Sequence, residues 1–326
     1  MRIVVRWAIA TMALMAAGAA NAQSNTAQTK WPERPVKLVV GFTAGSATDV
    51  SARVMAQKFS EAWGQPVVVE NVAGNSGAIG VDRVAKAAPD GYTLMWSGNA
   101  AITILPSLQT LPFDPLKDFE FITISLVTGS IVVVNNDLPV KSLGELIAHA
   151  KANPGKLSYG SPGVGTPQHV TGELLSKLAS IKMEHIPYRG ANLTDVMSGV
   201  VPVGIQNAGA AMPFVRDGRV RGLALTSPKR SPGAPELPTV AEQGFPGFEA
   251  TSWFALMAPK GTPQPILTKV REASLAVLAD GEAMKRFVAI GLDPVGGTAA
   301  EMRTTMETDI PKWAKVIKEA NIKVGN

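Results

Sequence analysis

Small and polar residues after one apolar run could bind an anion. The run, residues 36–41, is followed by a loop that supplies these candidate contacts: Phe42, Thr43, Ala44, Gly45 and Ser46. Ser46 stands three residues before Asp49, a spacing typical of a capping box, in which side chains satisfy the free amides of a helix's first turn. Free N–H groups and the positive end of a helix attract negative charge. The stretch therefore predicts an anion site in which Asp49 caps the helix and holds the loop.

A second stretch has the same design. A predicted strand over residues 156–161 leads into a loop with further candidate contacts: Ser161, Val164, Gly165 and Thr166. Thr166 suits an N-cap, and Pro167 suits the first helical position because its missing N–H would have no partner there. Each loop alone could be an ordinary turn that needs glycine for its dihedral angles. The case for a site depends on both loops occurring in one chain.

Residues that commonly carry enzyme chemistry are sparse. The histidines are His149, His169 and His185, and none has a nucleophile or metal-ligand partner at a diagnostic spacing. His169 and Glu173 form an i, i+4 pair, which is more often a helix-surface contact than a zinc site. Arg189 follows a predicted strand and could either reach an anion or remain solvated. We therefore expect no catalytic residue, no metal site and no cofactor.

The composition is that of a globular protein, with 46% of the 326 residues hydrophobic and 17% charged. Arg2 and Arg6 precede an apolar run at 9–20, and Ala20-Asn21-Ala22 fits a cleavage site. Residues 1–22 are therefore predicted to be a signal peptide cleaved after Ala22, with an uncleaved anchor as the alternative. Cleavage removes two arginines and lowers the formal net charge from +5 to +3, which is too weak to indicate nucleic-acid binding. The chain has no cysteine, so no disulfide or thiol chemistry is expected.

Apolar strands alternate with amphipathic helical patterns along the rest of the chain, which predicts an α/β fold. Long extended runs at 121–135 and 249–259 interrupt this rhythm and predict crossings between two domains. Domain I would comprise residues 31–127 and 252–326, and domain II residues 128–251. The two loops then fall in different domains, and ligand sites of α/β proteins favour strand ends and clefts. Each loop could hold one negative end of a small molecule.

Several short motifs occur in a characteristic order. They are Val67-Val68-Val69-Glu70-Asn71, Ala88-Pro89-Asp90-Gly91-Tyr92, Ile186-Pro187-Tyr188-Arg189-Gly190, Leu237-Pro238-Thr239-Val240 and Thr251-Ser252-Trp253-Phe254. In this order they resemble the Bug receptors, the periplasmic substrate-binding proteins of tripartite tricarboxylate transporters. The resemblance runs from Trp31 to the last helix. It implies a two-domain Venus-flytrap fold with two mixed, mostly parallel sheets and helices on both faces.

The resemblance also implies a function. The protein would be a monomeric periplasmic receptor that binds a small mono- or dicarboxylate, aromatic ones included, and serves a membrane permease. The family's ligand loops fall on residues 42–49 and 161–166. The remaining candidate ligand contacts are Asn99, Gln206 and Asn207, and the supporting residues are His169 and Arg189.

The sequence departs from the family pattern at a few positions. Gly41 and Ala44 stand where the family usually has prolines, and Ser46 stands where it has glycine. Gln206 stands where similar proteins commonly carry aspartate, which favours a ligand with more negative charge or no amine. A receptor for an amino acid, a ligand sensor without a transport role and an α/β enzyme are the alternatives.

Overall fold

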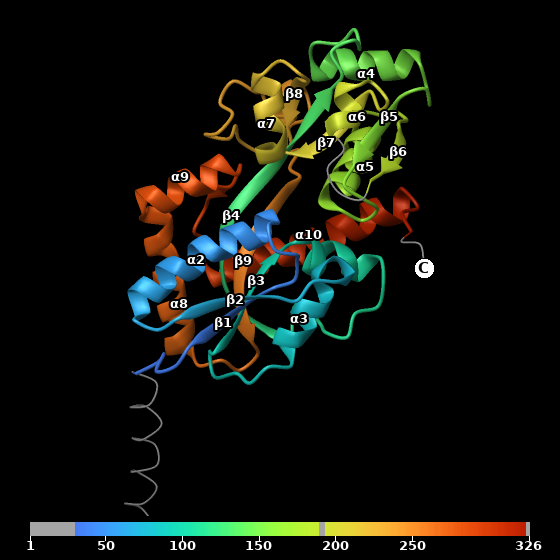
Figure 1. Cartoon of the computed structure of the whole chain (residues 1–326). Helices are drawn as coiled ribbons and strands as arrows, with labels where there is room; N and C mark the ends of the chain where they lie inside the picture. The colour runs from blue at the N-terminus through green and yellow to red at the C-terminus, as the bar shows by residue number, and fades with distance from the viewer. Residues whose placement is uncertain (1–29, 189–192, 324–326) are drawn as a thin grey trace, which may run out of the picture.

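The computed structural model describes residues 30–188 and 193–323, so the predicted signal peptide and Arg189 lie outside the described residues. Figure 1 shows two α/β lobes joined by long strands. We call β1–β3 with their helices the first lobe, and β5–β8 with theirs the second lobe. No helix in the described ranges is both long and apolar enough to cross a membrane.

The first lobe is built on three parallel strands. β1 (Val36–Val40) lies between β2 (Val67–Asn71) and β3 (Thr93–Gly98). Helix α2 (Ala47–Trp63) connects β1 to β2, and α3 (Ala78–Ala85) connects β2 to β3. Short helical turns follow or precede these elements: η1 (Asn75–Gly77), η2 (Ala100–Ile104) and η3 (Leu105–Ser107). The α2 helix ends at Gly64, whose φ of 64° is left-handed, as is common for a glycine that terminates a helix.

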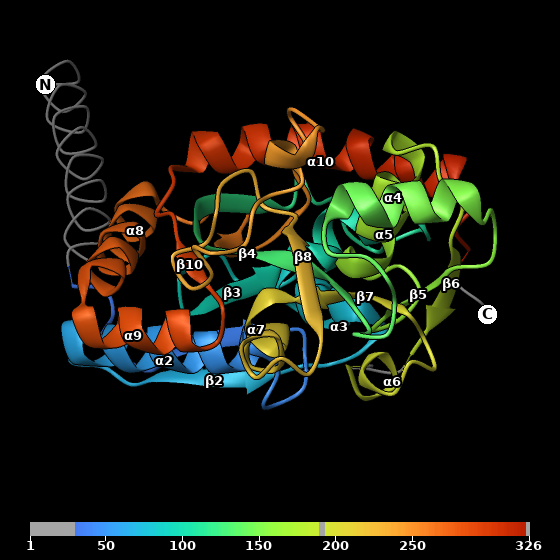
Figure 2. The ribbon, with the colours of Figure 1, turned by 90° about the horizontal axis from the view of Figure 1, so that it is seen from above.

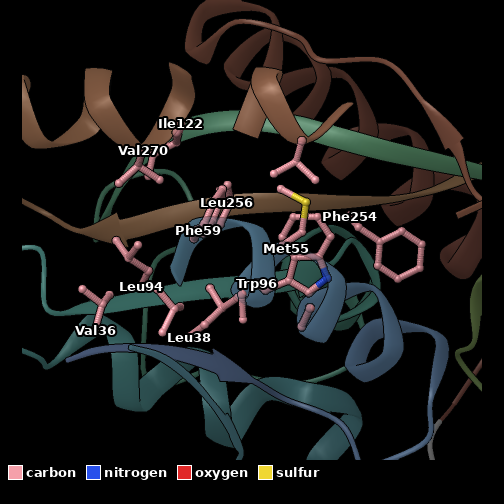
Figure 3. Close-up of a cluster of buried hydrophobic side chains, with 14 of the residues drawn as sticks. Val36, Leu38, Met55, Phe59, Leu94, Trp96, Ile122, Phe254, Leu256 and Val270 are labelled. Atoms are coloured by element: carbon pink, nitrogen blue, oxygen red, sulfur yellow. The ribbon is translucent and has the colours of Figure 1, made fainter. Parts of the chain in front are cut away.

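The core of the first lobe fills the space between its sheet and α2. Met55 and Phe59, four residues apart, lie on one face of α2 and are fully buried. Figure 3 shows them against side chains of the strands and of helix α8 (Gln264–Ala279): Val36, Leu38, Leu94, Trp96, Leu256 and Val270. Burying a side chain of this size contributes about 1.5–3 kcal/mol, so this face holds α2, and with it the loop at its start, in place.

The second lobe repeats the plan. β5 (Ser158–Ser161) runs parallel to β6 (Glu184–Pro187) and β7 (Val203–Asn207). β8 (Arg221–Leu225) pairs with a strand shared by both lobes. The helices of this lobe are α4 (Leu143–Ala152), α5 (Pro167–Leu178), α6 (Leu193–Met197) and α7 (Ala208–Arg216), with the turn η4 (Ala241–Gln243).

The chain passes between the lobes at two long strands. β4 (Phe119–Val134) pairs antiparallel with β9 (Thr251–Pro259) over its first part and with β7 and β8 over its last part. These are the extended runs predicted from the sequence. Because β4 belongs to both halves, the strands form one connected path rather than two separate sheets. The predicted mixed α/β fold is confirmed: β1–β3 and β5–β7 pair in parallel within their lobes, whereas β4 and β9 run antiparallel to their neighbours.

Thr226 ties the crossing strands together. Its hydroxyl accepts the N–H of Ser130 at 2.8 Å and donates to the carbonyl of Ala250 at 2.7 Å. Its backbone N–H donates to Ser130 and its carbonyl accepts from Ala250, both at 2.9 Å. The side chain is fully buried, so one threonine satisfies backbone groups on both segments where the chain passes between lobes.

The C-terminal elements pack on both lobes. α8 (Gln264–Ala279) and α9 (Gly281–Ala289) lie beside α2, and β10 (Asp293–Pro294) pairs with β4. Helix α10 (Ala299–Glu319) runs along one face of the molecule in Figure 2. Its Met302 joins the core of the first lobe, and its Trp313 joins the core of the second. The domain boundaries at 127/128 and 251/252 stay a prediction.

Candidate functional site

A cavity of about 210 Å³ lies between the lobes and is lined by both. The first lobe contributes Phe42, Thr48, Ser76, Gly98, Asn99 and Ala100. The second contributes Gly165, Thr166, Pro167, Gln168 and Asn207. Strand β9 adds Ser252, Trp253 and Phe254. None of these lining residues is ionisable near neutral pH, so polarity comes from hydroxyls, amides and the backbone.

The first predicted loop reaches this cavity at the start of α2. Ser46 caps the helix, because its Oγ accepts the N–H of Asp49 at 3.2 Å. The reciprocal bond of the predicted capping box, from the N–H of Ser46 to the carboxylate of Asp49, is absent from the described residues. The N–H of Ser46 donates instead to the carbonyl of Thr43 at 3.2 Å, and the Asp49 carboxylate accepts the N–H of Gly45 at 2.8 Å.

Asp49 is the organising residue of the first loop. The carboxylate is buried and accepts from Arg53 Nε at 3.0 Å and from Asn71 Nδ2 at 2.9 Å. Asn71 Nδ2 also donates to the carbonyl of Phe42 at 3.0 Å, which fixes the residue that lines the cavity. Burial alone would raise the pKa of Asp49, but the hydrogen bonds from Arg53, Gly45 and Asn71 outweigh it and lower that pKa. Asp49 therefore holds the loop directly and stays ionised.

In the second loop, His169 has the position that Asp49 has in the first loop. Thr166 caps α5, its Oγ1 accepting the N–H of His169 at 3.3 Å, and the N–H of Gly165 donates to His169 Nδ1 at 3.1 Å. Gly45 and Gly165 are both left-handed, with φ of 83° and 73°. Each loop thus has a left-handed glycine, a hydroxyl cap, and a side chain four residues after the glycine that accepts the glycine's N–H.

The hydrogen bonds within the two loops determine which backbone N–H groups remain free to bind a ligand. The N–H groups of Gly45 and Gly165, expected from the sequence to hold an anion, are already donated to Asp49 and His169. Among the described residues, no acceptor is found for the N–H of Thr48 or Gln168, each the second residue of its helix. Free amides and the positive ends of α2 and α5 therefore converge on one cavity.

A pair of stacked histidines supports the second loop. The rings of His169 and His185 lie 3.6 Å apart at 11°, and His185 Nε2 lies 2.7 Å from the hydroxyl of Ser161. Burial, with the charge of His185, lowers the pKa of His169 to about 3, and burial lowers that of His185 to about 4. Both rings are therefore neutral at ordinary pH. Because Gly165 donates to Nδ1, the His169 proton is on Nε2, which lies 4.0 Å from Glu173.

Two asparagines complete the cavity wall. Asn99 connects β3 to β9, since its N–H donates to Trp253 O and its Nδ2 to Thr251 O, both at 3.1 Å. Asn207 caps α7, with its Oδ1 accepting the N–H of Gly209 at 3.0 Å. A third helix thus begins at the same cavity.

The structure sorts the predicted contacts into two groups. Those that line the cavity are Phe42, Asn99, Gly165, Thr166 and Asn207. Those that do not line it are Thr43, Ala44, Gly45, Ser46, Asp49, Ser161, Val164 and Gln206. Thr43, Ala44 and Val164 are exposed, whereas Ser161 and Gln206 are buried on their strands. His169 supports the loop, and Arg189 lies outside the described residues.

Some lining residues were missed from the sequence. Thr48 lies within the ligand loop 42–49 that the resemblance implies but was not named as a contact. Gln168 occupies the matching position two residues after its cap, so alignment of the two loops would have found both. Trp253 and Phe254 carried a signal, because they belong to a motif of the resemblance. Ser76 carried none.

A larger groove of about 580 Å³ lies along α10 and contains neither loop. It shares Trp253 with the cavity, and the indole N–H of Trp253 donates to Asp309 at 3.0 Å on the groove side. Its other polar groups already have partners: Glu301 closes the capping box of α10, and Lys312 donates to the carbonyl of Glu249 at 2.6 Å. The cavity between the lobes is therefore the better candidate site.

Comparison with known proteins agrees with this geometry. The model of the tripartite tricarboxylate transporter family receptor matches residues 51–322. Protein BugT of Bordetella pertussis is 36% identical over 301 residues, which is 90% of this chain and 91% of BugT. The proteins of this family are receptors, which agrees with the expectation of a binding protein rather than an enzyme.

Solved structures with the same fold include two ligand complexes. R. palustris Rpa4515 with adipate has 36% identity and a TM-score of 0.78, over 90% of this chain and 99% of that one. MatC from Rhodopseudomonas palustris with bound malate has 28% identity and a TM-score of 0.74, over 88% of this chain and all (100%) of that one. The fold, the paired loops and the family match lead to one conclusion: the chain belongs to the receptors of the tripartite tricarboxylate transporter family.

Proposed function

We propose that the protein binds a small carboxylate in the cavity between its lobes. The observation that carries this proposal is the opposed placement of two helix N-termini, those of α2 and α5, at one cavity without charged lining residues. A helix end contributes about 0.3–1 kcal/mol to anion binding when exposed and up to about 2 when partly buried. Hydrogen bonds to a charged group add about 1.5–3 kcal/mol each. Two such ends fit a dicarboxylate, with one carboxylate at each loop.

The ligands of similar receptors support the proposal. Rpa4515 is solved with adipate and MatC with malate, and both ligands carry two carboxylates. The cavity presents no aspartate or glutamate to an ammonium group, so an amino acid is disfavoured.

The cellular location, the oligomeric state and the partner of the protein are inferred from its family. We infer a periplasmic protein, exported by a signal peptide over residues 1–22, that acts as a monomer and delivers its ligand to a membrane permease. The two domains proposed from the sequence would open and close around the cavity.

Titration calorimetry tests the proposal. The panel contains malate, succinate, adipate, citrate and an aromatic carboxylate, together with a neutral sugar and a cationic amino acid. Micromolar binding of at least one carboxylate is expected. Binding of the sugar or the cationic amino acid alone would refute the proposal.

A cavity-filling variant tests the location. Ala100 lines the cavity and is partly buried, so Ala100→Leu places three more carbon atoms in the space without removing a cap or a hydrogen-bonding side chain. We expect loss of carboxylate binding at least tenfold, with Ala100→Ser as the small control. Thr166→Tyr is a poorer choice because it also removes the N-cap of α5. Unchanged affinity in Ala100→Leu would place the ligand elsewhere.

A further inference from the structure

A second contact between the lobes lies beyond the cavity, where the start of α7 meets the end of α9 (Figure 2). Gly209 is the second residue of α7, and Gly291 is the second residue after α9. Their backbones touch. A methyl carbon at Gly209 would lie 2.0 Å from the carbonyl oxygen of Ile290, and one at Gly291 would lie 2.2 Å from the nitrogen of Gly209. We call this contact of Gly209, Ile290 and Gly291 the glycine seam.

The seam has no room for a side chain on either surface. Real Cβ atoms essentially never approach another heavy atom within 3.0 Å, and the atoms met here belong to backbone, which cannot rotate away. Any residue other than glycine at position 209 must therefore push α7 and α9 apart by about one ångström or more if both helices keep their form, because 2.0 Å must rise to at least 3.0 Å.

The seam is connected to the cavity through one residue. Asn207 lines the cavity and accepts the N–H of Gly209 at 3.0 Å. Its Nδ2 also lies 3.5 Å from Thr128 Oγ1 on β4. The first residues of α7 thus have the cavity on one side and the seam on the other, so displacement of Gly209 displaces the cavity wall.

A side-chain hydrogen bond crosses the same interface. The hydroxyl of Ser231, in the chain that follows β8, donates to the Asp293 carboxylate of β10 at 3.0 Å. Ser231 is buried, so this bond is shielded from water. The positive end of α7 also faces the carbonyl end of α9, which is a favourable alignment of helix dipoles.

We propose that the glycine seam is the stop for closure of the two lobes, and that Gly209 and Gly291 are positioning residues for ligand binding. Lobes that meet backbone to backbone at the seam bring the α2 and α5 loops to the separation seen at the cavity. A residue that holds the seam apart leaves the cavity too wide to engage both ends of a ligand at once. This inference rests on the proposed carboxylate-binding function and adds how the site is set.

The variant Gly209→Ala separates this role from a structural one. Position 209 is helical, without a positive φ, and alanine is a better helix former than glycine, so α7 itself should not lose stability. Gly144→Ala is the matched control, because Gly144 lies inside α4, is exposed, and has only Ser142 Oγ nearby at 3.9 Å. Malate and adipate serve as probes.

The expected result has three parts. Gly209→Ala binds the probe at least tenfold more weakly than wild type, whereas Gly144→Ala binds like wild type. The melting temperature of unliganded Gly209→Ala is not lowered. The decrease in radius of gyration that the probe causes in wild type, measured by X-ray scattering, is reduced in Gly209→Ala. Wild-type affinity and compaction in Gly209→Ala would overturn the proposal.

A crosslink provides an independent measurement if Gly209→Ala is unstable. The chain has no cysteine, so Ser231→Cys with Asp293→Cys introduces a single pair across the same interface. With oxidised glutathione as the oxidant, the disulfide should form faster when the probe is present. An identical rate with and without the probe would refute closure at the seam. Failure of wild type to bind any carboxylate of the panel in calorimetry counts instead against the proposed function.

Discussion

Replacing Asp49 by asparagine tests how the first loop is held. Two donors meet each carboxylate oxygen: Gly45 N–H and Arg53 Nε meet Oδ2, and Asn71 Nδ2 and Arg53 Nη2 meet Oδ1. An asparagine keeps one oxygen, so in either orientation its amide group faces two donors. One of these belongs to Arg53, whose side chain is about half exposed (52%) and can turn to water. The other, from Gly45 or Asn71, loses its partner.

The expected loss of stability follows from the number of donors that are left without an acceptor. An unsatisfied donor costs about 1–3 kcal/mol when buried, and loss of a charged acceptor weakens the remaining bonds. We expect Asp49→Asn to lower the free energy of unfolding by about 2–4 kcal/mol at pH 7, measured by urea denaturation. Asp217→Asn, at an exposed position after α7, is the control and should change stability by less than about 0.5 kcal/mol.

The same variant carries a signature in pH. The pKa of Asp49 is lower in the folded protein than the ordinary value of 3.8, so its contribution is complete above about pH 4 and is lost as pH falls through the folded pKa. The difference between wild type and Asp49→Asn should therefore shrink below pH 4. A loss under about 1 kcal/mol at pH 7, or a difference independent of pH, would refute the account of Asp49 as the anchor of the loop.

Two further predictions concern other buried polar groups. Thr226→Val removes the acceptor of Ser130 N–H and the donor to Ala250 O, so urea denaturation should show a loss of about 2–4 kcal/mol, and a loss below about 1 would contradict the bridging role. The folded pKa of His185, about 4, lies below its ordinary 6.5, so the unfolded chain takes up the proton first and stability is lost as pH falls from 6.5 toward 4. His185→Gln should lose less stability over that range in melting experiments, and an equal loss in both proteins would assign it to other groups.

Local patterns predicted the helices well, because caps and periodic apolar residues are written in short stretches of sequence. The Thr166 cap with Pro167 gave the start of α5. The paired loops were found in the same way. The hydrogen bonds inside each loop were predicted less well. The Ser46 and Asp49 spacing indicates a cap, but it does not tell which amide the carboxylate accepts, and Gly45 takes the place that Ser46 was expected to fill.

Contacts between distant segments explain the remaining differences. Asn99 meets the strand that begins at Thr251 through a bond that spans 152 positions, and Trp253 enters the cavity only because β9 pairs with both β3 and β4. Periodicity in one segment carries no information on its distant partner. The antiparallel direction of the crossing strands has the same origin, since it depends on the path of the chain between them.

The long β4 strand has a consequence for how the molecule comes apart. Its first residues pair with β9 and its last with β7 and β8, so melting of either lobe removes hydrogen-bonding partners from a strand on which the other lobe depends. The lobes of a hinged receptor could otherwise unfold one after the other. With β4 as a common structural member, unfolding is expected as a single cooperative transition, so a destabilising change in either lobe lowers the stability of the whole receptor.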